Sequence, residues 1–150
     1  MKKEPNISLR DATEKDTEFA RVTHHTAYRD VIIKQFGSWD DKLQDKFFYV
    51  NWNNPGFKII NLNGNPCGYT RIEYLPNQVE GHELVISPDC QSRGVGTFIL
   101  HNLIEEARKR DVPAKLQVFT QNRAIELYNR MGFSEIDRND NHIIMEWRPE

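Results

Sequence analysis

The six residues Gln91-Ser92-Arg93-Gly94-Val95-Gly96 carry the clearest chemical signal in this sequence. They lie between an apolar run, Leu84-Val85-Ile86, and a segment from Thr97 in which apolar residues recur at helical spacing. A glycine-containing loop between a strand and a helix leaves backbone N–H groups unpaired at the positive end of the helix, where phosphate-type anions bind. The glycines let a ligand approach the backbone closely. The segment therefore predicts a bound pyrophosphate.

Ionisable residues on the preceding strand form a second group that could do chemistry. If side chains alternate faces there, Glu80, His82, Leu84 and Ile86 share one side, and Glu83 faces the other way unless a bulge reverses the alternation. The intrinsic pKa of histidine, about 6.5, suits His82 as a general base, whereas Glu80 would need burial to reach that range. The alternatives are solvated strand-end carboxylates and a packed strand histidine.

The elements that must position these residues follow one another without a repeat or linker. Their order, βααβββαβαββ, predicts an α/β (α+β) fold: a mixed sheet with helices on both faces. Asn63-Gly64 is the expected hairpin turn, and Thr13 and Asp16 can cap the first helix. The expected strands are 7–10, 57–62, 68–75, 79–86, 115–119, 133–136 and 143–147, and the helices are 13–33, 39–52, 94–110 and 122–131.

Length and charge bound the class of protein. The 150 residues suit one domain, and the formal net charge of −2 argues against a nucleic-acid or anionic-membrane partner. No apolar run approaches the ~20 residues that span a bilayer, and Met1-Lys2-Lys3-Glu4-Pro5-Asn6 lacks the apolar core of a signal peptide. Cys67 and Cys90 have no CxxC spacing, which favours incidental thiols over a disulfide or metal. We expect a cytoplasmic protein without a metal.

Two motifs in the expected order identify a family. Gln91, Gly94 and Gly96 fit an (Arg/Gln)-x-x-Gly-x-(Gly/Ala) loop after a fourth strand. The segment after the fifth strand is close to Asn-x-x-Ala-x-x-x-Tyr-x-x-x-Gly-Phe, departing only in having Ala directly after Arg123; its matching residues are Asn122, Arg123, Ala124, Tyr128, Gly132 and Phe133. The chain resembles the GCN5-related N-acetyltransferase (GNAT) superfamily, by motif over about 79–133 and by element order elsewhere.

The resemblance implies one GNAT domain over 1–150, with a mostly antiparallel sheet of six to seven strands. A nucleotide-binding Rossmann domain is disfavoured, because three antiparallel strands precede the loop and no G-x-G-x-x-G is complete. The implied cosubstrate is acetyl-CoA. Its pantetheine arm would run beside Val85 and Ile86, where a backbone N–H would stabilise the oxyanion of the tetrahedral intermediate. Its pyrophosphate would lie over Gln91, Ser92, Arg93, Gly94, Val95, Gly96 and Thr97.

The resemblance also implies roles for single side chains. Gln91 would donate to phosphate, and Arg93 is either a cation beside the phosphates or a solvated arginine. Tyr128 would protonate the departing thiolate as a general acid, its alternative being a core aromatic. Glu80 and His82 match positions where family members place a base. Asn122 would bind the pantetheine amides while also serving as a helix N-cap.

The acceptor is the least constrained part of the prediction. Six aromatic or cationic residues could line an acceptor box, although aromatics at helical spacing are also typical of a core: Tyr28, Arg29, Phe36, Trp39, Trp52 and Tyr74. His24 and His25 should face different directions on a helix, which argues against a metal site. We expect a small-molecule primary amine. A protein N-terminus or lysine, which would need an open groove, and a non-catalytic CoA sensor are the alternatives, and a homodimer is left open.

Overall fold

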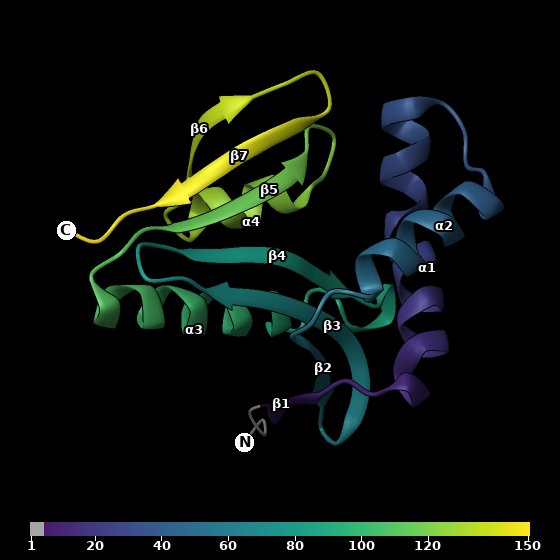
Figure 1. The fold of residues 1–150 in the computed structure, drawn as a ribbon, viewed down its shortest axis with the longest axis horizontal. Helices are drawn as coiled ribbons and strands as arrows, with labels where there is room; N and C mark the ends of the chain where they lie inside the picture. Colours follow the sequence, from purple (N-terminus) through teal and green to yellow (C-terminus); the bar gives the residue numbers. More distant parts are fainter. Residues whose placement is uncertain (1–4) are drawn as a thin grey trace.

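Seven strands form one sheet in the order β1-β2-β3-β4-β5-β7-β6 (Figure 1). The computed structural model describes residues 5–150. Residues 1–4 belong to the N-terminal segment that is expected not to be a signal peptide, and they lie outside the described residues. All neighbouring strands pair antiparallel except β4 and β5, which pair parallel. The strands are β1 (Ile7–Asp11), β2 (Phe57–Leu62), β3 (Asn65–Tyr74), β4 (Val79–Ile86), β5 (Ala114–Phe119), β6 (Ser134–Arg138) and β7 (His142–Trp147). The predicted mixed, mostly antiparallel sheet is confirmed.

Four α-helices connect these strands, in the predicted order. The α2 helix begins where the Asp40 carboxylate accepts a hydrogen bond from the Leu43 N–H at 2.9 Å, a side-chain N-cap. The α1 helix ends at Gly37, whose φ of +89° is the left-handed conformation that favours glycine. The bounds are α1 (Thr17–Phe36), α2 (Asp41–Trp52), α3 (Val95–Arg110) and α4 (Ala124–Arg130). No helix in the described chain is long and apolar enough to cross a membrane.

The helices cover both faces of the sheet (Figure 1). On one face, Ala20 of α1 and Phe48 of α2 pack against Ile59, Tyr69 and Val85 of the sheet. On the other face, α3 packs on β2 to β4, and α3 and α4 pack together on β5 and β7. These cores hold the helices against a sheet that is interrupted at its centre.

The interruption lies between β4 and β5. The two strands pair over only three positions: Val79 with Ala114, Glu80 with Lys115 and Gly81 with Leu116. Beyond Leu116, β5 pairs with β7 alone among the described strands. The second half of β4, from His82 to Ile86, therefore presents backbone N–H and C=O groups toward an opening in the sheet.

A β-bulge at His82 changes the faces of β4. Glu83 lies opposite Arg71 and Gly81 lies opposite Ile72, so His82 is one extra residue in β4. Leu84 and Ile86 pack in the cores on the α3 face, whereas Val85 packs beneath α1 and α2.

The expectation that Glu80 and His82 share a face with Leu84 and Ile86 is therefore wrong. Glu80, His82 and Glu83 all point to the α1–α2 side, because the extra residue shifts the alternation by one position. The structure contains the bulge that the sequence analysis named as the exception to regular alternation.

Candidate active site

A cavity of about 1150 Å³ occupies the opening between β4 and β5. It extends from α1 and α2 on one face of the sheet to α3 on the other, so it crosses the sheet where the strands separate. Most of its wall is aromatic or aliphatic, with a few ionisable groups. Residues from different elements that line it include Tyr28, Phe47, Glu83, Leu103, Phe119 and Tyr128.

Glu83 is the carboxyl group that the fold perturbs most strongly. Asn51 of α2 donates a hydrogen bond from Nδ2 to Glu83 Oε1 at 2.7 Å. Burial raises the pKa of Glu83 to about 7, against the opposing effects of this hydrogen bond and of Arg71. A carboxyl group with this pKa exchanges a proton readily at neutral pH, which is what a general base requires.

Tyr128 enters the same cavity from α4. The residue is only 8% exposed, and its hydroxyl makes no hydrogen bond to a described residue. No fully buried side-chain N or O atom in the described chain lacks a partner, so this hydroxyl faces the cavity. Burial, with the nearby Glu83 carboxylate, raises the pKa of Tyr128 to about 12. The phenol thus stays protonated at neutral pH and can donate a proton.

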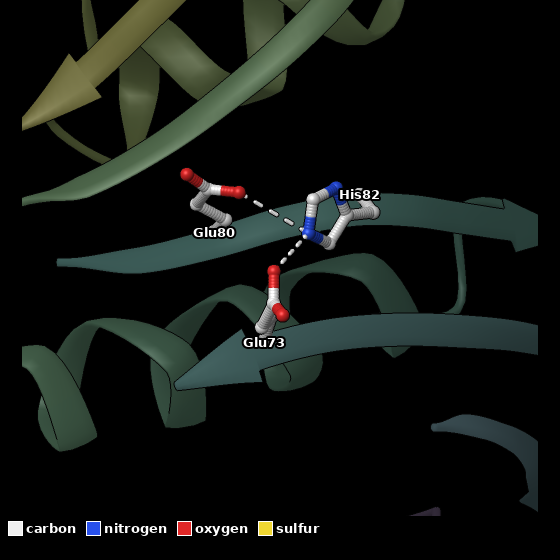
Figure 2. A group of neighbouring side chains, drawn as sticks. All are labelled: Glu73, Glu80 and His82. Carbon is white, nitrogen blue, oxygen red and sulfur yellow. Dashed lines mark hydrogen bonds and ion pairs between the residues drawn. The ribbon is translucent and has the colours of Figure 1, made fainter. Parts of the chain in front are cut away.

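His82 pairs with Glu80 and with Glu73 of β3 (Figure 2). His82 Nε2 lies 3.0 Å from Glu73 Oε1 and 3.2 Å from Glu80 Oε2, and Gln78 donates a further hydrogen bond to Glu80. Three potential ligand atoms lie within 4.8 Å of one another here, on partly exposed side chains. Both predicted bases line the cavity, but Nε2 of the histidine is already engaged by two carboxylates.

The loop before α3 has the geometry of an anion site. Ser92 and Gly94 adopt φ values of +63° and +82°, so the chain turns sharply before the helix. The N–H groups of residues 92–97 donate to no described residue. A Cβ atom on Gly96 would lie 3.1 Å from Leu127 Cδ2, so glycine lets the first turn of α3 approach α4 closely. Gln91 donates instead to the Ile86 carbonyl at 3.1 Å, and Arg93 is exposed.

Asn122 lies just before α4 and bonds to its first residue. Its Oδ1 accepts a hydrogen bond from the Ala124 N–H at 2.9 Å, although the N-cap position of α4 is Arg123, one residue later than predicted. The side chain also lines the cavity, and its Nδ2 donates to no described residue. An amide donor therefore faces the space beside Tyr128.

The acceptor residues expected from the sequence separate into different environments. Tyr28 and Phe36 line the cavity. Trp52 packs in the core, stacked on Phe48. The remaining three lie elsewhere: the Arg29 guanidinium lies over the Trp39 ring, and the Tyr74 ring lies beneath Arg110.

The expectation that His24 and His25 face different directions is wrong. Their Nδ1 atoms lie 2.9 Å apart, and His25 Nε2 reaches Asp45 of α2 at 2.6 Å. Because α2 packs against α1, Asp45 lies within hydrogen-bond distance of His25, whose ring also contacts His24. Residue spacing on one helix cannot show a partner on another helix.

Known proteins share this fold and parts of this sequence. A family model described as "Acetyltransferase (GNAT) family" matches residues 24–133. An uncharacterised N-acetyltransferase of Methanocaldococcus jannaschii is 34% identical over 101 residues, which are 59% of this chain and 45% of that protein. The [ribosomal protein bS18]-alanine N-acetyltransferase of Escherichia coli is 30% identical over 89 residues, 55% of this chain and 60% of the enzyme. The matched region thus spans about half the length of these relatives.

The fold of the whole described chain is also found in solved structures. A PaiA N-acetyltransferase from Thermoplasma acidophilum, crystallised in complex with coenzyme A, superposes with a TM-score of 0.72. The likeness covers 95% of this chain and 99% of that protein at 17% sequence identity. This similarity concerns the fold.

Proposed function

Because the chain belongs to the GNAT acetyltransferase family, we propose that it is an acetyl-CoA-dependent N-acetyltransferase acting on a primary amine. The amine attacks directly, with both substrates bound. The observation that carries this proposal is the cavity through the sheet, which brings a carboxyl group with a pKa near 7 and a protonated phenol into one space. Acetyl-CoA, when bound, supplies the activated acetyl thioester.

The residues around the opening fit this cosubstrate. The unpaired N–H groups of residues 92–97 suit a pyrophosphate, and the free backbone edge of β4 beside Val85 and Ile86 suits the amides of a pantetheine arm. The Asn122 amide adds a donor to the same space. Gln91 can exchange its bond to the Ile86 carbonyl for one to a phosphate. The related fold that was crystallised with coenzyme A supports this assignment.

Glu83 and Tyr128 divide the proton chemistry between them. An alkylamine with a pKa of about 10.4 is mostly charged at pH 7, so a proton has to leave before the nitrogen can attack. Glu83 accepts the proton that the nitrogen loses as it attacks, and Tyr128 donates one at the sulfur of the leaving thiol. Backbone N–H groups on the free edge of β4 can stabilise the negative charge that develops on the carbonyl oxygen.

The acceptor we propose is a small-molecule amine with an apolar body. The α1–α2 end of the cavity is walled by Tyr28, Phe36, Phe47 and Phe119, with Glu83 as a carboxylate partner for a cationic amine. A protein N-terminus is the second candidate, because the relative in Escherichia coli is named for an alanine of ribosomal protein bS18.

A thiol-release screen with acetyl-CoA tests this function. The panel contains arylalkylamines, polyamines, amino acids, aminoglycosides and a peptide that begins with alanine. We expect release with an arylalkylamine and little with the peptide. Preference for the peptide would instead identify a protein acetyltransferase. Tight CoA binding without release from any amine would identify a sensor and overturn the proposal.

The pH–rate profile of Glu83→Gln tests the assignment of the base. In the native enzyme, we expect kcat/KM to fall below a pKa near 7, because a protonated Glu83 cannot accept a proton. Glu83→Gln should lower the rate at pH 7.5 by about 100-fold and abolish that limb. Glu80→Gln and His82→Gln are the matched controls, and we expect both to keep it. Loss of the limb in either control, with Glu83→Gln unaffected, would move the base to that residue.

A further inference from the structure

Three side chains form a hydrogen-bonded line from the cavity toward solvent. Asp45 Oδ1 lies 2.6 Å from His25 Nε2, and the Nδ1 atom of His25 lies 2.9 Å from the Nδ1 atom of His24. His24 lines the cavity, whereas the Asp45 side chain is 37% exposed. The line therefore connects the acceptor space with bulk water through two imidazole rings.

The tautomers of both rings follow from this line. A neutral imidazole has one N–H donor and one acceptor nitrogen. His25 has to donate from Nε2, because the Asp45 carboxylate can only accept, so in the neutral ring His25 Nδ1 carries a lone pair. That lone pair requires His24 to donate from Nδ1. The second nitrogen of His24, Nε2, then carries a lone pair and donates to no described residue.

The reaction itself requires a path for one proton. An ammonium acceptor and acetyl-CoA give an amide, free CoA thiol and one proton in excess. The amine nitrogen loses two protons in all, and the sulfur gains one. The other has to leave a cavity that lies inside the fold.

We propose that His24 is a catalytic residue that takes the first proton from the acceptor ammonium, and that His25 and Asp45 conduct it to solvent. The proton binds at His24 Nε2, the Nδ1 proton of His24 passes to His25 Nδ1, and the Nε2 proton of His25 passes along its bond to Asp45. Asp45 then loses that proton to water. The starting tautomers return when each ring rotates away from its partner and exchanges its remaining proton with water, rather than by transfer back along the line. This proposal rests on the acetyltransferase function.

The surroundings of the two rings favour transfer away from the cavity. Burial lowers the pKa of His24 to about 4, so a proton does not remain on this ring. His25 pairs with a carboxylate that is itself held by Arg21 at 3.0 Å. The negative charge of Asp45 lies beyond His25 and attracts a proton in the direction away from the cavity.

Other ionisable groups that face His24 and His25 are few. On α1 itself, Tyr28 lies beside His24 with ring centroids 4.9 Å apart. The loop before α2 contributes the uncharged Trp39 ring, 5.1 Å from that of His25. From the sheet, Glu83 lines the same cavity. Glu83 can take the second proton of the amine, so the two groups serve successive proton losses.

Two measurements test the relay, and the first needs no turnover. In ¹H–¹⁵N spectra of the imidazole rings at pH 7, we expect His24 to be neutral with its proton on Nδ1, and His25 to carry its proton on Nε2. Asp45→Asn should disturb both signals, whereas Thr26→Ala, on an exposed part of α1, should disturb neither. A charged His24, or one with its proton on Nε2, overturns the relay whatever the activity screen finds.

The second measurement separates a proton-transfer role from a structural one. With 2-phenylethylamine, which is cationic at pH 7, His24→Gln should lower kcat/KM about tenfold or more at pH 7, with recovery as the pH approaches the amine pKa. With aniline, which enters uncharged, the variant should match the native enzyme. Equal losses at every pH and with both amines would mean a structural role and overturn the proposal. If the native enzyme acetylates neither amine, the acetyltransferase function is in question and the spectra alone decide the relay.

Discussion

Burial acts on Glu83 and Tyr128 in the same direction and has opposite consequences for them. Both pKa values rise, because each charged form is disfavoured in the cavity. For the carboxyl group this brings the pKa to about 7, where it can gain and lose a proton. For the phenol it gives a pKa of about 12, which keeps the proton on the oxygen at neutral pH.

Replacing Tyr128 with phenylalanine tests the acid role. The change removes only the hydroxyl, so the packing against Phe133 is kept. We expect kcat to fall by about 100-fold, the lower end of what a general acid contributes. The affinity for CoA, measured by calorimetry, should change less than about twofold. An unchanged kcat would make Tyr128 a core aromatic.

The raised pKa of Glu83 also predicts a stability change with pH. The pKa of Glu83 is about 7 in the folded protein and about 4.5 in the unfolded chain. The folded protein therefore binds this proton more tightly than the unfolded chain does. The native protein should therefore lose stability as the pH rises from about 4.5 to 7, by about 1–3 kcal/mol after allowance for the solvent in the cavity. Glu83→Gln should lose less over this range in urea unfolding. Parallel curves for both proteins would contradict the shift.

At the level of elements, the loop before α3 combines an unusual backbone with free N–H groups. Gly94 and Gly64 have similar φ values, +82° and +85°, and open space where a Cβ would lie. Alanine at either position should cost about 1 kcal/mol in the free energy of unfolding, because φ is positive. Only Gly94→Ala should also weaken CoA binding, by about tenfold in calorimetry. Equal affinities in the two variants would place the phosphates elsewhere.

The order of the elements could be predicted from periodicity and turn residues alone. The turn at Asn63-Gly64 lies where the sequence places it, and the seven strands and four α-helices follow in the predicted order. The faces of β4 could not be predicted, because a period-2 pattern assumes a regular strand and the extra residue at His82 breaks it. No composition signal marks that bulge, so the sequence ranks Glu83 behind Glu80 and His82 as a base.

The contact between His24 and His25 was beyond sequence reasoning for a different reason. It depends on Asp45, which lies on another helix and 20 residues further along the chain. Helical spacing describes one helix at a time, whereas a side-chain network depends on how two helices pack. The same limit applies to Asn51 and Glu83, whose bond joins α2 to β4.

At the scale of the whole molecule, the opening in the sheet divides the structure into two parts that one ligand can join. The β4 edge and the anion loop lie on one side, and β5 with α4 lies on the other. A cosubstrate that contacts both should stabilise the fold. At 100 times its Kd, binding contributes about 2.7 kcal/mol, which corresponds to a rise of about 5–10 °C in Tm for a chain of this size.

A thermal shift series over CoA concentration measures this effect. Adenosine diphosphate is the matched control, because it has the pyrophosphate and lacks the arm that would lie along β4. We expect a smaller rise in Tm with it. Equal shifts with both ligands would mean that the opening does not take part in binding.

The three-pair joint between β4 and β5 also sets a limit on protein engineering. Thermostable variants are commonly obtained by completing interactions that a natural protein leaves unmade. In this protein, the hydrogen bonds that are missing are those that would pair β4 with β5 beyond Leu116. A design that added these hydrogen bonds would give a more stable protein, but it would close the cavity in which the two substrates have to bind.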